Sequence, residues 1–285
     1  MYQLIPDWVK IRYYILRGRR PWSRGYFTFK HTYIKNVLGR KELLEIFKKG
    51  IPLPKGYGQK LDERVVEYPW AISRIPAVEE ASLLDAGSTL NFKEIVEAHA
   101  LQNKSMTFVT LSPEAFCFWE KGISYLFADL RDLPLRDSSF DTITCISTLE
   151  HVGMDNSIYT TDGRYKEGKK FDFEKAIREF KRVLKAGGKV LITVPFGKYR
   201  SFGYFQQFDS SLVARVLEVF EPKDFHVTYY KYAKEGWNIS DQNSCNECEH
   251  FNMRETKYFN KKSTLDFDDD GAAASRAVAC IEMIK

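Results

Sequence analysis

Acidic and imidazole side chains follow a short apolar segment near the middle of the chain. After residues 141–147 (DTITCIS) come Glu150 and His151, and Asp155 lies four residues further on. A histidine titrates near neutral pH and can accept a proton, and a neighbouring carboxylate can orient its ring. These three residues are therefore candidates for proton transfer. The alternative interpretation of His151 is a structural histidine that hydrogen-bonds the backbone.

Two other apolar segments also end in residues that suit a ligand. Asp85 lies near the end of the segment at 82–86, and Gly87 follows it. A glycine lets the backbone approach a ligand where a side chain would block it. Asp129 follows the segment at 124–128. If these segments are neighbouring parallel strands, their polar ends meet at one edge of a sheet.

The elements that would position these residues alternate along the chain. Apolar segments predict strands near residues 82–86, 106–111, 124–128, 141–147, 189–194, 225–231 and 277–284. Helical periodicity and flanking turn residues predict helices at 41–49, 91–102, 113–121, 172–185 and 210–220. The expected fold is α/β, with a doubly wound, seven-stranded, mostly parallel sheet. Its ligand crevice should lie over the carboxyl ends of the first and fourth strands.

The chain divides into two parts by composition. Residues 1–80 form a basic, aromatic N-terminal extension, in which Pro69 and Pro76 should limit any helix before the first strand. Residues 81–285 carry the α/β pattern. Within them, residues 232–275 are a long polar insertion before the last strand.

The segment ADLRDLPLRDSSFD (residues 128–141) resembles the pattern G-D-A-x-x-L-P-F-x-D-x-S-F-D of the class I S-adenosylmethionine (SAM)-dependent methyltransferases, type 11-like. The resemblance implies a Rossmann-like methyltransferase fold, SAM as cofactor, and methyl transfer as the activity. It implies that Asp129 accepts a hydrogen bond from the adenine amino group and that Leu130 offers its backbone N–H. The full set of cofactor-binding residues that it implies is Asp85, Gly87, Ser88, Thr110, Asp129, Leu130 and Ser147.

The sequence departs from the family pattern at three places. Thr89 and Asn91 replace later glycines of the first turn, and Thr110 stands where the family has the acid that binds the ribose hydroxyls. Glu114 could substitute for that acid. These departures support an alternative, a catalytically inactive methyltransferase-like binding or scaffold protein. A nicotinamide dehydrogenase is less expected, because the first turn lacks G-x-G-x-x-G.

The expected acceptor is a small molecule or a glycan, methylated at a hydroxyl with His151 as the base. The segments DERVVEYPW and LDAGSTLN resemble uncharacterised methyltransferase-like proteins linked to surface-polysaccharide assembly, which implies a sugar acceptor. Ubiquinone-type O-methyltransferases have a similar E-x-x-E-H, which can hold a metal. Here Ser147 replaces its first glutamate, so no metal is expected there.

The motif Cys245-x-x-Cys248-x-His250 allows three interpretations. Two thiolates and an imidazole suit zinc, but a fourth ligand is not evident, unless Glu247 or Glu249 serves. The two cysteines could instead form a redox pair. A metal-free loop is the favoured interpretation.

The sequence of the N-terminal extension allows several interpretations of what it contacts. It could cover the active site, lie on an anionic membrane surface through residues 8–24, bind a polyanion, or pack with its charges facing water. Nucleic acid is not expected, since no reader motif accompanies the charge. The net charge is +5, and no apolar run approaches the roughly 18–20 residues of a membrane span. Without a secretory signal pattern, we expect a cytoplasmic protein.

Overall fold

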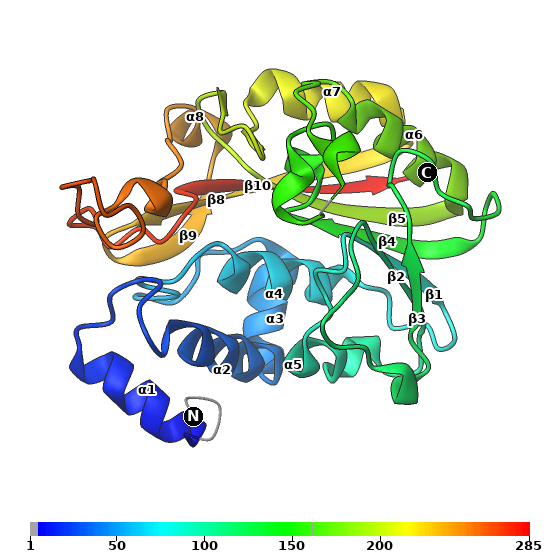
Figure 1. Cartoon of the computed structure of the whole chain (residues 1–285). Helices are drawn as coiled ribbons and strands as arrows, with labels where there is room; N and C mark the ends of the chain where they lie inside the picture. Colours follow the sequence, from blue (N-terminus) through cyan, green and yellow to red (C-terminus); the bar gives the residue numbers. More distant parts are fainter. Residues whose placement is uncertain (1–4, 161) are drawn as a thin grey trace.

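A single mixed β-sheet forms the centre of the computed structural model, which describes residues 5–160 and 162–285 (Figure 1). Its eight strands lie in the order β3-β2-β1-β4-β5-β10-β8-β9. They are β1 (Ser82–Ala86), β2 (Ser105–Thr110), β3 (Ser124–Phe127), β4 (Phe140–Ile146), β5 (Leu184–Pro195), β8 (Asp224–Ala233), β9 (Gly236–Ser240) and β10 (Ala277–Ile284). Strands β1 to β5 are parallel, whereas β10 is antiparallel to both β5 and β8. The mostly parallel sheet with an antiparallel last strand is confirmed.

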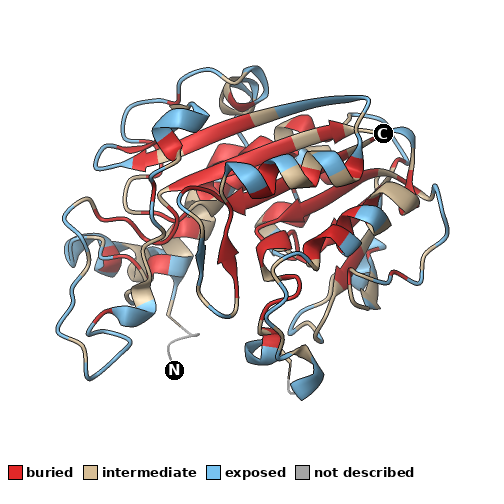
Figure 2. Ribbon diagram, turned by 90° about the horizontal axis from the view of Figure 1, so that it is seen from above, coloured by how far each residue is buried: buried red, intermediate tan, exposed pale blue. Residues whose placement is uncertain are grey.

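Strand order reverses at β1, which lies between β2 and β4. The loops that leave the carboxyl ends of β1 and β4 therefore run to opposite faces of the sheet, and a crevice opens between them. Most residues of the central strands are buried, as the red strands of Figure 2 show. Burial on both faces explains why these strands read as continuous apolar segments.

The sheet has one strand more than the seven predicted. Strand β9 lies inside the insertion at 232–275 and forms a hairpin with β8. Gly236 begins it at a φ of 107°, where a Cβ would collide with the backbone of Tyr57. The next residue, Trp237, is buried and donates its indole N–H to the Leu61 carbonyl at 3.0 Å. Contacts with the distant N-terminal part therefore stabilise a strand that no local pattern predicts.

Helices cover both faces of the sheet (Figure 1). On one face lie α6 (Phe173–Val183) and α7 (Ser210–Phe220), and on the other lie α2 (Tyr26–Leu38), α3 (Lys41–Lys49), α4 (Arg64–Arg74) and α5 (Lys93–Val96). The remaining elements are α1 (Asp7–Leu16), α8 (Gln242–Cys245), the short strands β6 (Arg200–Ser201) and β7 (Gln206–Gln207), and several single-turn 3-10 helices. The predicted helices at 41–49 and 210–220 have the observed bounds. In the described residues, no helix is both long and apolar enough to cross a membrane.

Two predicted helices are largely wrong. Only α5 and a 3-10 turn (His99–Leu101) form within 91–102, and only a 3-10 turn (Trp119–Lys121) forms within 113–121. The Asn91 side chain explains the second case, because its amide donates to the Phe116 carbonyl at 2.8 Å. The Tyr125 hydroxyl holds this segment as well, donating to Asn91 Oδ1 at 2.8 Å and accepting from the Phe118 N–H at 2.9 Å. These side-chain contacts replace helical hydrogen bonds.

Helix α4 contradicts the expectation that Pro69 limits any helix in this region. Pro69 lies inside α4, and its missing N–H leaves the carbonyl of Val65 without the usual helical donor. The Tyr57 hydroxyl supplies that hydrogen bond at 2.6 Å. A residue from the preceding loop therefore makes the proline tolerable.

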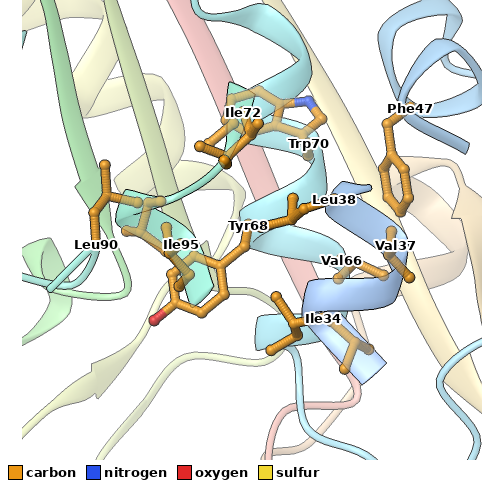
Figure 3. Close-up of a cluster of buried hydrophobic side chains, with 14 of the residues drawn as sticks. Ile34, Val37, Leu38, Phe47, Val66, Tyr68, Trp70, Ile72, Leu90 and Ile95 are labelled. Carbon is orange, nitrogen blue, oxygen red and sulfur yellow. The ribbon is translucent and has the colours of Figure 1, made fainter. Parts of the chain in front are cut away.

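The N-terminal helices and the sheet share one hydrophobic core. Figure 3 shows buried side chains of α2, α3 and α4 side by side, among them Val37, Phe47 and Trp70. The same cluster includes Phe108 of β2 and Val278 of β10. The N-terminal extension is therefore a layer packed on the sheet rather than a detached segment.

Candidate active site

A cavity of about 460 Å³ lies at the carboxyl ends of the parallel strands. Turns after β1, β2, β3 and β4 line it, together with one residue of α4 and with Asn156, Tyr159 and Tyr165. The lining residues are Arg64, Gly87, Thr89, Val109, Thr110, Leu111, Ser112, Pro113, Glu114, Ala128, Asp129, Leu130, Arg131, Ser147, Thr148, His151, Val152, Gly153, Asn156, Tyr159 and Tyr165. Its volume lies within the usual range for small-molecule sites.

The structure brings most of the predicted site residues to this cavity, but not all of them. Those that line it are Gly87, Thr110, Asp129, Leu130, Ser147 and His151. Those that do not are Asp85, Ser88, Glu150 and Asp155. The second group lies beside the cavity, and its members have other contacts or are buried.

The turn after β1 is shaped by Gly87 and Asp85. Gly87 has a φ of 114°, and a Cβ there would collide with the Thr148 side chain at the end of β4. Asp85 is fully buried and accepts hydrogen bonds from the Leu90 N–H at 2.7 Å and the Thr144 hydroxyl at 2.9 Å. Burial raises its pKa to about 7, although both bonds oppose the shift. Asp85 therefore stabilises the turn, while Gly87 borders the cavity.

The turn after β2 presents Glu114 rather than a ribose-binding acid at the strand end. The Thr110 hydroxyl donates to the Ser112 carbonyl at 2.9 Å, so its proton is already used within the turn. Glu114 lines the cavity, and its carboxylate accepts from the Asn91 amide at 3.3 Å. The carboxylate at this side of the cavity is therefore that of Glu114.

The turn after β3 is held by an ion-pair network that the sequence did not reveal. Arg131 binds both oxygens of Asp129, with Nε at 3.0 Å from Oδ1 and Nη2 at 2.7 Å from Oδ2. The same guanidinium pairs with Asp172 and Glu167, each at 2.7 Å. The Asp129 hydrogen bonds raise the pKa of Arg131. Asp129 is therefore held in one orientation at the cavity by Arg131.

The turn after β4 presents His151 to the cavity. Its Nδ1 lies 2.7 Å from the Tyr204 carbonyl oxygen, and Tyr204 follows the short strand β6. Since a carbonyl can only accept, Nδ1 carries the proton and Nε2 keeps a free lone pair. Burial lowers the His151 pKa to about 4. The ring is therefore neutral at neutral pH, with one nitrogen able to accept a proton.

Glu150 and Asp155 do not orient His151, contrary to the sequence-based expectation. The Tyr204 carbonyl makes that contact. Glu150 is 3% exposed, its Oε2 has no hydrogen-bond partner in the described residues, and burial raises its pKa well above normal. Asp155 instead accepts from the Ser157 N–H at 3.0 Å, at the start of a 3-10 turn (Asn156–Ile158).

Two residues of α4 were missed as site residues. Arg64 lines the cavity and forms an ion pair with Glu67, which is fully buried. Glu67 Oε1 also accepts from the Ser147 hydroxyl at 2.7 Å and the Thr193 hydroxyl at 2.8 Å. The R-x-x-E spacing in DERVVEYPW is the signal that indicates such a pair, since residues three apart are neighbours on a helix. The N-terminal layer thus contributes a cation to the cavity.

The CNECEH loop is not arranged as a metal site. Cys245 and Cys248 are buried free thiols, and the neighbouring Cys245 thiol lowers the pKa of Cys248 to about 7. His250 Nδ1 lies 3.2 Å from the Ser275 hydroxyl. Across the described ranges, 5–160 and 162–285, no three or more His, Cys, Asp or Glu side chains are grouped to hold a metal.

Comparison with known families agrees with this geometry. Residues 86–192 match the sequence model of a family described as a methyltransferase domain. This match identifies residues 86–192 as a methyltransferase domain. SAM is accordingly the cofactor of this methyltransferase. The matched residues hold the turns after β1, β2, β3 and β4.

Several solved structures are similar to this methyltransferase. The YcgJ protein of Bacillus subtilis is 15% identical, with a TM-score of 0.44 over 77% of this chain and 97% of that one. A SAM-dependent methyltransferase of Thermotoga maritima, described as a possible histamine N-methyltransferase, is 12% identical, with a TM-score of 0.45 over 98% and 100% of the two chains. A search of curated proteins finds no significant match.

Proposed function

We propose that this methyltransferase methylates a hydroxyl of a small-molecule or glycan acceptor in the 460 Å³ cavity, with His151 as the proton acceptor. The observation that carries the proposal is the His151 ring itself. Its Nδ1 is committed to the Tyr204 carbonyl, so its unprotonated Nε2 is the atom available at the cavity. A hydroxyl acceptor needs such a base, because it loses its proton as the new O–CH₃ bond forms.

The residues around the cavity suit SAM. Gly87 leaves room for a ligand to approach the backbone of the first turn, and the Glu114 carboxylate suits two ribose hydroxyls. Asp129 and the backbone of Leu130 suit the adenine edge, in agreement with the family pattern. SAM supplies a methyl group that its sulfonium already makes electrophilic.

The protein then mainly aligns the acceptor and removes its proton. Alignment alone can contribute several kcal/mol, on the order of 7–11 for well-oriented reactants. We assign His151 to take the proton, and the Tyr204 carbonyl to hold the ring while it is charged. Arg64, Tyr159 and Asn156 line the same cavity and are available to contact the acceptor. A glycan acceptor rests on the sequence resemblance alone.

An inactive binding protein is the second candidate function. Thr89 and Asn91 stand in place of glycines, and the Thr110 hydroxyl is bonded to Ser112. The Asn91 amide hydrogen-bonds to the Glu114 carboxylate and the Phe116 carbonyl, so it stabilises the turn after β2. Binding of a ligand without turnover would favour this candidate.

Calorimetric titration of SAM into the purified protein tests cofactor binding first. Asp129→Ala should weaken SAM by about 1.5–3 kcal/mol, the range for a hydrogen bond to a charged group. Asp132→Ala is the matched control, since this exposed acid of the same loop does not line the cavity. Equal SAM affinity in both variants would contradict the adenine assignment.

Turnover with paired acceptors then tests the transfer. Hydroxyl compounds, including methyl glycosides, are compared with amines of similar size by following S-adenosylhomocysteine release. Methylation of a hydroxyl supports the proposal. Methylation of amines alone would contradict the hydroxyl assignment while leaving the family assignment intact.

A further inference from the structure

Helix α1 displays large apolar side chains to solvent. Trp8 is 67% exposed, Ile15 49% and Leu16 76%. Arg12 is also exposed, and its spacing from these three residues places all four on one side of the helix. We call Trp8, Arg12, Ile15, Leu16 and the following Arg17 the α1 surface. Neighbouring large apolar side chains that are exposed together indicate an interaction site.

The opposite side of α1 is firmly packed. Tyr14 is fully buried, with its ring centroid 6.0 Å from that of Tyr26 and 5.3 Å from that of Phe29. Gly25 has a φ of 94°, and a Cβ there would contact the backbone of α1 at Lys10. The helix is therefore held in one orientation, and the exposure of the α1 surface is not a consequence of a loose terminus.

The charge around this surface is positive. Arg12 and Arg17 are exposed, and neither has a carboxylate partner in the described part of the chain. The one acid of α1, Asp7, already pairs with Lys10 at 2.9 Å. The guanidinium of Arg20 lies 3.9 Å from the ring centre of Tyr258, so the adjoining loop is also cationic and aromatic.

We infer that the α1 surface docks this protein on an anionic lipid membrane. Tryptophan, leucine and isoleucine enter the region between headgroups and acyl chains, while the arginines meet the lipid phosphates. A polyanion such as nucleic acid would use the arginines but leave the exposed Trp8 and Leu16 without a contact. Figure 1 shows α1 at the edge of the molecule, where a flat surface can reach it.

The geometry favours a lipid surface over a protein groove. The α1 surface is one projecting helix with apolar and cationic side chains interleaved, not a concave apolar groove. With 10 residues, α1 is too short to cross a bilayer and would lie in the interface. This inference is independent of the acceptor and of the role of His151.

Flotation of the full-length protein with vesicles tests the inference. We expect binding to vesicles of phosphatidylcholine mixed with phosphatidylglycerol, little binding to phosphatidylcholine alone, and release by added salt. Replacing Trp8 and Leu16 by serine should weaken binding roughly tenfold or more. Each of Arg12→Gln and Arg17→Gln should weaken it about fivefold, the ratio that corresponds to one surface cation near anionic lipid.

Matched controls come from the same chain. Trp119 is 71% exposed on a distant 3-10 turn, and Arg136 is exposed on the loop after β3. Trp119→Ser and Arg136→Gln should leave vesicle binding unchanged. Brominated lipid should quench tryptophan emission of the wild type but not of Trp8→Phe.

Three outcomes would overturn the inference. They are absence of binding to anionic vesicles, equal loss in the Trp8 and Trp119 variants, and binding without quenching of Trp8. Gel filtration of the wild type and of the Trp8 and Leu16 double variant tests whether the α1 surface instead binds a second copy of the chain. Concentration-dependent association that these changes abolish, without vesicle binding, would assign the surface to a second copy of the chain.

Discussion

The Ser147 hydroxyl donates a 2.7 Å hydrogen bond to the Glu67 carboxylate, and so joins the end of β4 to helix α4. The Thr193 hydroxyl of β5 binds the same oxygen at 2.8 Å. Glu67 is fully buried, and its other oxygen pairs with Arg64, which lines the cavity. Through this one carboxylate, the N-terminal layer is fixed to the edge of the sheet where the methyltransferase motifs meet.

Removing the cation from this arrangement should destabilise the protein strongly. Arg64→Met leaves the buried Glu67 carboxylate without its charged partner, and we expect a loss of about 3–5 kcal/mol in the free energy of unfolding. Denaturation by guanidinium chloride measures this loss. Arg164→Met is the control, because Arg164 makes an exposed ion pair and should leave the midpoint unchanged. A comparable shift in both variants would contradict the structural role of the Arg64–Glu67 pair.

Replacement of His151 should separate catalysis from cofactor binding. His151→Ala should lower turnover by roughly a hundredfold or more, since general-base help is typically worth 10²–10⁴. SAM affinity, measured by calorimetry, should stay nearly intact. Because the His151 pKa is about 4, turnover should show no histidine transition near pH 6.5 and should fail only as the pH approaches 4. His226→Ala, at an exposed histidine, is the control and should turn over normally. Normal turnover in His151→Ala as well would show that another residue is the base.

The same histidine should make the folded state sensitive to acid. Burial lowers the pKa of His151 from 6.5 to about 4, so between these values the unfolded chain binds a proton that the folded chain does not. The free energy of unfolding should therefore be intact above pH 6.5 and decrease as the pH falls toward 4. Urea denaturation at pH 7 and pH 5 measures how steeply the free energy of unfolding changes with pH. In His151→Gln the decrease should be smaller, and an identical slope in wild type and variant would exclude His151 as its source.

Glu114, not Thr110, should carry the ribose contact. Glu114→Gln removes a charge at the cavity and should weaken SAM by about 1.5–3 kcal/mol. Thr110→Val should have a smaller effect, because the Thr110 hydroxyl already donates to Ser112. Calorimetric titration of both variants compares them directly. A larger loss of SAM affinity in Thr110→Val than in Glu114→Gln would assign the ribose contact to Thr110 instead.

Purified protein should contain no structural zinc. The CNECEH loop offers two free thiols and one histidine, which is hydrogen-bonded to the Ser275 hydroxyl, whereas a closed zinc site needs four ligands. Elemental analysis of protein prepared without a metal-binding tag measures the content, and a chelator should leave the melting temperature unchanged. One equivalent of zinc that is lost in Cys248→Ser would contradict this prediction.

Local pattern was sufficient for the elements that the chain encodes in consecutive residues. The strand at 82–86, the helix at 210–220 and the motif at 128–141 each depend on residues close in sequence. Hydrophobic periodicity and turn chemistry act over a few residues, so these elements and the methyltransferase family followed from the sequence. The convergence of Gly87, Asp129 and His151 on one cavity followed as well, because parallel strands bring their carboxyl ends together.

Tertiary contacts decided the rest. Pro69 lies within a helix because Tyr57, twelve residues earlier, satisfies the carbonyl that proline leaves free. Arg64 reaches the cavity because Glu67 is bonded to residues 80 and 126 positions away. His151 is neutral because burial, which depends on the whole surrounding fold, disfavours its charged form. Such effects depend on residues distant in sequence, so no local pattern in the chain encodes them.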